Sequence, residues 1–133
     1  MTDVYDYGVD EENYFIVMRR YAESLKTWRS KQEKSLNENL SLYLSIYKSI
    51  LKAMTTIHSH NVTHYDIKCD NILLDFDSSS PDGTGIVITV GDFGECKMYT
   101  SEKDEFDEKN RGTEVIMSPE MLMLAINTRK DTA

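Results

Sequence analysis

A histidine, two aspartates, a lysine and an asparagine fall within the eight residues HYDIKCDN, residues 64–71. Such a run can be a solvated polar loop, which is its commonest fate, or a loop that holds a metal-bound phosphate. Carboxylate and amide oxygens bind hard divalent cations, and a lysine offers a compact positive charge to a phosphate. The elements around the run have to decide between these two interpretations.

An apolar helix is predicted before this loop and a pair of strands after it. Apolar side chains recur at three- and four-residue steps over residues 41–60, which predicts one continuous core helix. ILLDF at 72–76 and IVITV at 86–90 are β-prone, and the intervening DSSSPDGTG is turn chemistry, so an antiparallel hairpin is predicted. The turn loosely resembles a calcium loop, but it lacks the glycine at loop position 6 and the glutamate at position 12, so we reject that interpretation.

The N-terminal part of the chain predicts two more strands and a polar connection. Residues 4–7 and YFIVM at 14–18 are short β-prone runs, with residues 8–13 as the turn between them. Residues 26–39 hold many charges and neither proline nor glycine, which favours a solvated helix or a connector. Leu25 and Trp28, three positions apart, are the predicted buried edge of this segment.

Length and composition limit the classes of protein to consider. The 133 residues have room for one domain, and 40% hydrophobic with 29% charged residues is a globular composition. A net charge of −8 without a basic stripe argues against nonspecific nucleic-acid binding. No run approaches the ~18 apolar residues of a membrane span, and the N-terminus does not have the pattern of a signal peptide. Two distant cysteines suggest neither a disulfide framework nor a zinc site, so a cytoplasmic location is expected.

Two further strings follow the polar loop: D-F-G at 92–94 and G-T-x-x-x-M-S-P-E at 112–120. Together with H-x-D-x-K-x-x-N at 64–71, they resemble the middle of the catalytic domain of eukaryotic protein kinases. Each string alone is weak evidence, but the three in this order, separated by a hairpin and preceded by an apolar helix, are strong. The resemblance covers residues from about 4 to about 126 and implies that residues 1–133 are a partial, kinase-like α+β domain.

The resemblance implies a role for each polar residue of the candidate site. Asp66 would accept or orient the proton of the acceptor hydroxyl, and Lys68 would neutralise the γ-phosphate of ATP. Asn71 and Asp92 would bind Mg²⁺ and, through it, ATP. Lys68 together with Thr113 favours serine/threonine specificity, because in that branch of the family both residues contact the catalytic aspartate. The expected activity is transfer of the γ-phosphate of ATP to serine or threonine hydroxyls of a protein substrate.

Four residues are assigned to the adenine site by the same resemblance. YFIVM would be the last strand of the small lobe, with Met18 at the gatekeeper position. Arg19 and Tyr21 would belong to the hinge, whose backbone groups bind adenine. Leu73 would form the apolar floor beneath the adenine ring.

His64 and the two cysteines are assigned no catalytic role. His64 resembles the family's structural histidine, which packs near the position of Phe93. Cys69 and Cys96 lie in no reactive or metal-binding pattern and are interpreted as bystanders.

Three positions depart from the family pattern. Tyr65 stands where the family usually has an arginine that pairs with a phosphate on the activation segment. Ile116 and Ser118 replace a common tyrosine and a common alanine. Because tyrosine cannot form that ion pair, phosphorylation at Thr100 or Ser101, which are candidate sites by position alone, is expected to change activity little.

The resemblance covers only part of a kinase domain. Residues before 4 do not supply the glycine-rich loop, the strand lysine or its helix glutamate, and residues after 126 do not supply the late large-lobe helices. We therefore expect weak magnesium–ATP binding and no measurable transfer by the isolated chain, with residues 92–120 as its least ordered part. A pseudokinase-like binding module or an inactive truncated remnant is the alternative. A small-molecule phosphotransferase shares H-x-D-x-x-x-x-N but is disfavoured by the two later strings.

Overall fold

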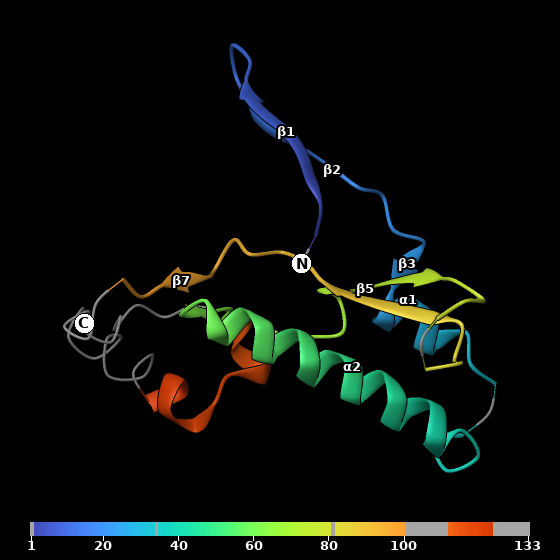
Figure 1. Cartoon of the computed structure of the whole chain (residues 1–133). Coiled ribbons are helices and arrows are strands. Elements are labelled where there is room, and N and C mark those ends of the chain that lie inside the picture. The colour runs from blue at the N-terminus through green and yellow to red at the C-terminus, as the bar shows by residue number, and fades with distance from the viewer. Residues whose placement is uncertain (1, 34, 81, 101–111, 124–133) are drawn as a thin grey trace. The chain divides into compact units, whose positions relative to one another are not determined.

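The chain forms two compact units in the computed structural model, which describes residues 2–33, 35–80, 82–100 and 112–123. The first unit takes residues 1–54 and 69–91, and the second takes residues 55–68 and 92–133. Both helices and strands are present, in agreement with the predicted α+β class (Figure 1). Residues 101–111, which include Ser101 and belong to the activation segment (residues 92–120), lie outside the described residues, as do residues 124–126.

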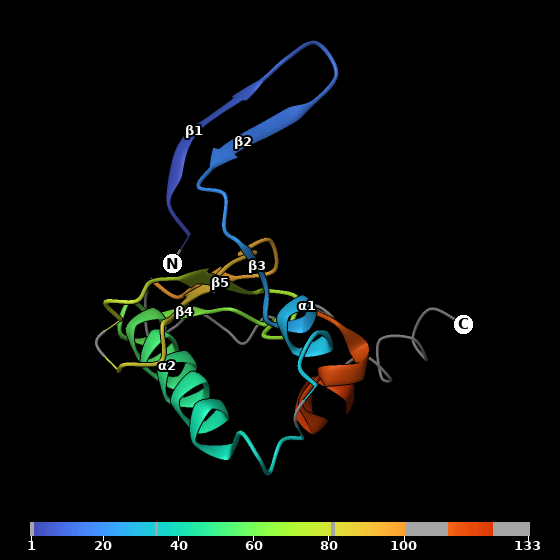
Figure 2. The ribbon, with the colours of Figure 1, turned by 90° about the vertical axis from the view of Figure 1, so that its right-hand side faces the viewer.

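The first unit begins with a two-stranded antiparallel ribbon. Strand β1 (Val4–Val9) pairs with β2 (Tyr14–Met18), and Figure 2 shows them as a narrow ribbon that residues 19–22 join to the next strand. β1 is two residues longer than predicted, because Gly8 and Val9 still pair with β2. The reversal therefore falls at Asp10, whose carboxylate accepts backbone N–H bonds from Glu12 and Asn13 at 3.0 and 2.8 Å. Exposed apolar residues on the ribbon are Val4, Tyr5, Tyr7, Val9, Tyr14, Phe15, Ile16, Val17 and Met18.

A three-stranded sheet, in the order β3-β5-β6, forms the core of the first unit. The predicted hairpin is confirmed, since β5 (Ile72–Phe76) pairs antiparallel with β6 (Ile86–Val90) from Ile72↔Val90 to Phe76↔Ile86. Ile72, Leu74 and Val90 are at most 2% exposed, whereas Phe76 at the other end of the same face is 55% exposed, so this face of the hairpin is buried at one end only. The short strand β3 (Glu23–Ser24) was not predicted, and it exists through its pairing with β5.

Helix α1 (Leu25–Ser30) follows β3 directly. The Ser24 side chain caps its start by accepting a hydrogen bond from the Thr27 backbone N–H at 3.2 Å. Leu25 and Trp28 are both buried, which confirms the edge predicted from their spacing. Of residues 31–39, those that the structure describes are not helical, so this predicted segment is part helix and part connector.

Helix α2 (Leu40–Ser59) is continuous and begins and ends one residue earlier than predicted. Its residues up to 54 belong to the first unit and the rest to the second. Ile46 and Ile57 are buried, whereas Leu44 and Tyr47 are more than half exposed. No helix in the described ranges combines the length and the apolar character that a membrane crossing requires.

The second unit is built around a short antiparallel pair. β4 (Val62–Thr63) pairs with β7 (Lys97–Met98), and the Tyr99 backbone N–H donates to the Asn61 carbonyl at 2.8 Å. A 3₁₀ turn, η1 (Glu114–Ile116), follows later, and residues 119–123 are helical. The polar loop predicted to carry the chemistry starts directly after β4.

Candidate active site

His64, the first residue of the loop, is a packing residue. It is 1% exposed, and its ring lies 4.8 Å from the ring of Phe93 at an interplanar angle of 55°. Its Nδ1 accepts a hydrogen bond from the Asp66 backbone N–H at 3.3 Å. The predicted contact with Phe93 is therefore confirmed, and the histidine helps to fix the backbone of Asp66.

Asp66, Lys68 and Thr113 form one hydrogen-bonded cluster. Asp66 Oδ1 accepts from the Thr113 backbone N–H at 2.9 Å and from the Thr113 hydroxyl at 2.6 Å. Lys68 Nζ lies 2.8 Å from Asp66 Oδ2 and donates to the Thr113 hydroxyl at 2.6 Å. Asp66 is 6% exposed, so its carboxylate is buried and fully oriented by these partners. Both contacts to the aspartate that the family resemblance implied are present.

A close approach at Gly112 brings Thr113 to Asp66. Gly112 has φ +85°, and a Cβ atom placed on it would lie 2.1 Å from the Tyr65 carbonyl oxygen. Tyr65 itself has φ +64°, in the left-handed region that non-glycine residues seldom adopt. Only glycine fits at position 112, because any side chain there would overlap the backbone just before Asp66.

The two candidate metal ligands are supported separately, one in each unit. Asp92 has φ +56°, and its Oδ1 accepts a hydrogen bond from the Gly94 backbone N–H at 3.3 Å. Asn71 is 7% exposed, and its carbonyl accepts from the Gly91 N–H at 2.8 Å. An amide and a carboxylate oxygen suit Mg²⁺, which takes few protein ligands and fills its shell with water and substrate phosphates. Clustering of Asp66, Asn71 and Asp92 around one ion stays a prediction.

The described residues contain no group of three or more histidine, cysteine, aspartate or glutamate side chains that could hold a metal ion. The oxygen donors of Asn71 and Asp92 remain the candidate set, and they match a metal that arrives with a phosphate.

The four residues assigned to adenine, Met18, Arg19, Tyr21 and Leu73, all belong to the first unit. The Arg19 backbone N–H donates to the Asp3 carbonyl at 2.9 Å, so adenine recognition by Arg19 would have to use its carbonyl group. Its guanidinium lies 5.4 Å from the centre of the Tyr21 ring and 2.6 Å from an Asp75 carboxylate oxygen. These contacts fix the segment between β2 and β3 against β5, the strand that carries Leu73.

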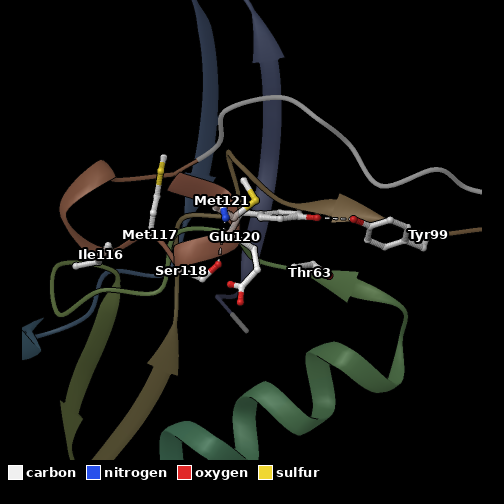
Figure 3. Close-up of a pocket in the computed structure, with 8 residues that line it drawn as sticks. Thr63, Tyr99, Ile116, Met117, Ser118, Glu120 and Met121 are labelled. Atoms are coloured by element: carbon white, nitrogen blue, oxygen red, sulfur yellow. Dashed lines mark hydrogen bonds between the residues drawn. The ribbon is translucent and has the colours of Figure 1, made fainter. Parts of the chain in front are cut away.

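Sequence reasoning missed Tyr99. The Tyr65 hydroxyl is hydrogen-bonded to the Tyr99 hydroxyl beside a cavity of about 520 Å³ (Figure 3). The two tyrosines are 34 positions apart, and Tyr99 lies in none of the three motifs, so no sequence signal indicated the pair. The cavity is lined by Thr63, Tyr65, Tyr99, Ile116, Met117, Ser118, Glu120 and Met121.

Comparisons with known proteins agree on one family. The protein kinase domain matches residues 1–132 of this chain. A probable serine/threonine-protein kinase of Dictyostelium discoideum is 40% identical over 137 residues, which cover 96% of this chain and 6% of that protein. The probable serine/threonine-protein kinase fhkA of the same organism is 32% identical, with 92% of this chain and 20% of that protein covered. The serine/threonine-protein kinase MRCK beta of Rattus norvegicus is 33% identical, with 87% and 6% covered.

The chain therefore spans between 6% and 20% of the length of these three relatives. The match to each of them takes in most of this chain, so it includes the residues of the candidate site.

Proposed function

The chain belongs to the protein kinase family, and we propose that its residues 1–133 form part of one serine/threonine-kinase catalytic domain. Members of the family transfer phosphate from ATP to proteins with the help of a divalent metal. The observation that carries the proposal is the buried Asp66 carboxylate, oriented by Thr113 and by Lys68. The pseudokinase-like alternative is not favoured by the relatives, which are named as serine/threonine kinases.

Asp66 is the proposed catalytic base. In the proposed reaction, the serine or threonine oxygen attacks the γ-phosphorus of ATP, the bond from that phosphorus to the β–γ bridging oxygen breaks, and ADP leaves. The hydroxyl proton passes to Asp66. The hydrogen bonds from Thr113 fix the carboxylate before substrate arrives, so no reorganisation is needed at the moment of transfer.

Lys68 is the proposed electrostatic partner of the transferred phosphate. Its ammonium group is already fixed within 2.8 Å of both Asp66 and the Thr113 hydroxyl, and its side chain is 26% exposed. A phosphate can therefore approach a positive charge whose position is set by the protein. The same lysine places its positive charge 2.8 Å from the carboxylate that is proposed to accept the proton.

Nucleotide binding is proposed to use the remaining residues of the candidate site. Asn71 and Asp92 would hold the divalent metal, which we propose to be Mg²⁺ and which would neutralise phosphate charge when bound. Leu73 would contact the adenine ring, with Met18 at its edge. Backbone groups of Arg19 and Tyr21 would hydrogen-bond to the base.

The test exchanges a segment between relatives, because the isolated chain is expected to transfer no measurable phosphate. Residues 1–132 replace the matching segment of the Dictyostelium kinase that is 40% identical, and transfer of radiolabelled phosphate to a generic serine/threonine substrate is measured. We expect the chimera to be active and Asp66→Asn to lower its rate by at least about 10²-fold.

Asp70→Asn is the matched control, since it makes the same change in the same loop at an exposed residue that pairs with Lys26. It should leave the rate within about twofold, as expected for an exposed ion pair. A folded chimera that binds nucleotide but transfers nothing would contradict the proposal and favour a pseudokinase-like module. If both substitutions lowered the rate of phosphate transfer equally, Asp66 would have no role that the exposed Asp70 lacks.

A further inference from the structure

Tyr65 is fixed at both ends. Its hydroxyl is hydrogen-bonded to the Tyr99 hydroxyl, and its backbone carbonyl faces Gly112 at a distance that admits no side chain. Tyr99 follows β7 directly, and its own backbone N–H donates to the Asn61 carbonyl at 2.8 Å. All four residues belong to the second unit, so the hydroxyl pair joins two segments of a single compact body.

The cavity beside the pair is lined by no lysine or arginine, although the Lys97 ammonium lies 5.0 Å from the centre of the Tyr99 ring outside that lining. Figure 3 shows Tyr99 on the opposite side of the cavity from Met117, Ser118 and Met121. Among the lining residues, all within the described ranges, the one charged side chain is Glu120. Its pKa lies below the usual value because its own backbone N–H and the Ser118 hydroxyl hydrogen-bond to its carboxylate, so it is negative at neutral pH. A phosphate here would meet one carboxylate and no lysine or arginine of the lining.

The next residue along the chain is the proposed base. Asp66 directly follows Tyr65 in the chain. Tyr65 has a left-handed backbone conformation, which its contacts must hold in place. A tether on the Tyr65 ring therefore restrains the peptide that carries the Asp66 N–H and fixes the start of the Asp66 side chain. The tether is a neutral hydrogen bond between two unmodified side chains, so it does not depend on phosphorylation.

We propose that Tyr65 and Tyr99 are positioning residues for Asp66, and that their hydroxyl pair does without modification what an arginine–phosphate pair does elsewhere. The proposal rests on the proposed function, because it assigns the effect of the pair to the catalytic base. The proposal goes beyond a loss of regulation by phosphorylation, because it identifies Tyr99 as the residue that takes the place of the phosphate.

The experiment measures the position of Asp66 directly in the full 133-residue chain. Amide hydrogen exchange of Thr113 is followed by NMR, because the Thr113 N–H donates to Asp66 Oδ1 and reports whether that carboxylate stays in place. Tyr65→Phe and Tyr99→Phe each remove one hydroxyl and keep the ring. Each should speed Thr113 exchange by roughly three- to tenfold, the effect of losing one hydrogen bond, and the double variant should add little.

Two further variants separate positioning from general loss of stability. Tyr47→Phe removes a hydroxyl from a residue of α2 that is 59% exposed, and Thr113 exchange should not change. Tyr65→Arg combined with Tyr99→Glu replaces the hydroxyl pair by an ion pair and should restore most of the protection, whereas Tyr65→Arg alone should not. Amides of β5 in the first unit should exchange at wild-type rates throughout.

The proposal would be overturned if the Thr113 amide exchanged at the wild-type rate in both single phenylalanine variants. It would also be overturned if the exchange rates of the β5 amides rose together with that of Thr113. Because this measurement needs no catalysis, it stands whether or not the chimera transfers phosphate. In an active chimera, Tyr65→Phe should lower kcat with little change in KM for ATP. A fall confined to KM would also contradict a positioning role.

Discussion

Thr113 donates both its backbone N–H and its hydroxyl to a single carboxylate oxygen of Asp66, 47 positions earlier in the chain. The same hydroxyl accepts a hydrogen bond from Lys68 Nζ. One threonine side chain therefore joins the carboxylate of Asp66 to the ammonium group of Lys68, two residues further along the chain. A residue near the end of the activation segment thereby completes the surroundings of the polar loop at 64–71. An apolar group of the same shape cannot replace the Thr113 hydroxyl, because it could neither donate to Asp66 nor accept from Lys68.

Thr113→Val should lower the free energy of unfolding by about 1.5–3 kcal/mol, because it removes one hydrogen bond to a buried carboxylate and one from an ammonium group. Urea denaturation followed by circular dichroism measures the change. Thr113→Ser keeps the hydroxyl and should cost less than about 1 kcal/mol. Equal losses from the two substitutions would show that the methyl group, and not the hydroxyl, is what matters.

Gly112→Ala should destabilise the chain by at least ~2 kcal/mol, since the new methyl group would overlap the Tyr65 carbonyl and the residue has φ +85°. The control is Gly83→Ala, at φ +70° with no atom within 4 Å of the added Cβ. That substitution should cost about 1 kcal/mol, the price of the backbone conformation alone. The difference between the two unfolding free energies measures the close approach, and a difference near zero would argue that the two segments are not in contact.

Leu74→Ala should cost about 2–5 kcal/mol, because Leu74 is fully buried in the central strand of the β3-β5-β6 sheet. Leu44→Ala is the matched change on α2, where Leu44 is 57% exposed, and it should alter stability by about 0.5 kcal/mol or less. Chemical denaturation of both variants tests where the core lies. A larger loss at Leu44 than at Leu74 would contradict the burial pattern.

Thr100→Glu, made in an active chimera, should change the rate of phosphate transfer by less than about twofold, because Tyr65 cannot form an ion pair with the added charge and the lining of the cavity beside it holds no cation. Steady-state kinetics at saturating ATP measure the effect. Adding Tyr65→Arg to this variant should make the rate depend on the residue at position 100. Strong activation by Thr100→Glu alone would mean that another residue pairs with the charge.

The local periodicity of the sequence was sufficient to predict the long elements, but it could not predict the contacts between distant segments. The stripe over residues 41–60 placed α2 within one residue at each end, and the β-prone runs on either side of the turn placed both strands of the hairpin. β3 has two polar residues and no period of its own, so only its pairing with β5 defines it.

The candidate site divides in the same way. The contacts of Asp66 with Lys68 and Thr113, and of His64 with Phe93, could be inferred from motifs that resemble a known family. The Tyr65–Tyr99 pair could not, because Tyr65 departs from the motif and its partner lies in none. Where a sequence leaves its family pattern, the compensating residue has to be found in three dimensions.

The pairing of Asp66 with Lys68 also has an electrostatic consequence for the capture of a polyanion. Their opposite charges, 2.8 Å apart, cancel at long range, so the catalytic loop presents almost no field of its own. The chain as a whole carries −8, which repels a nucleotide. Dissolved salt screens this repulsion, so it should help the encounter of the chain with a nucleotide rather than hinder it.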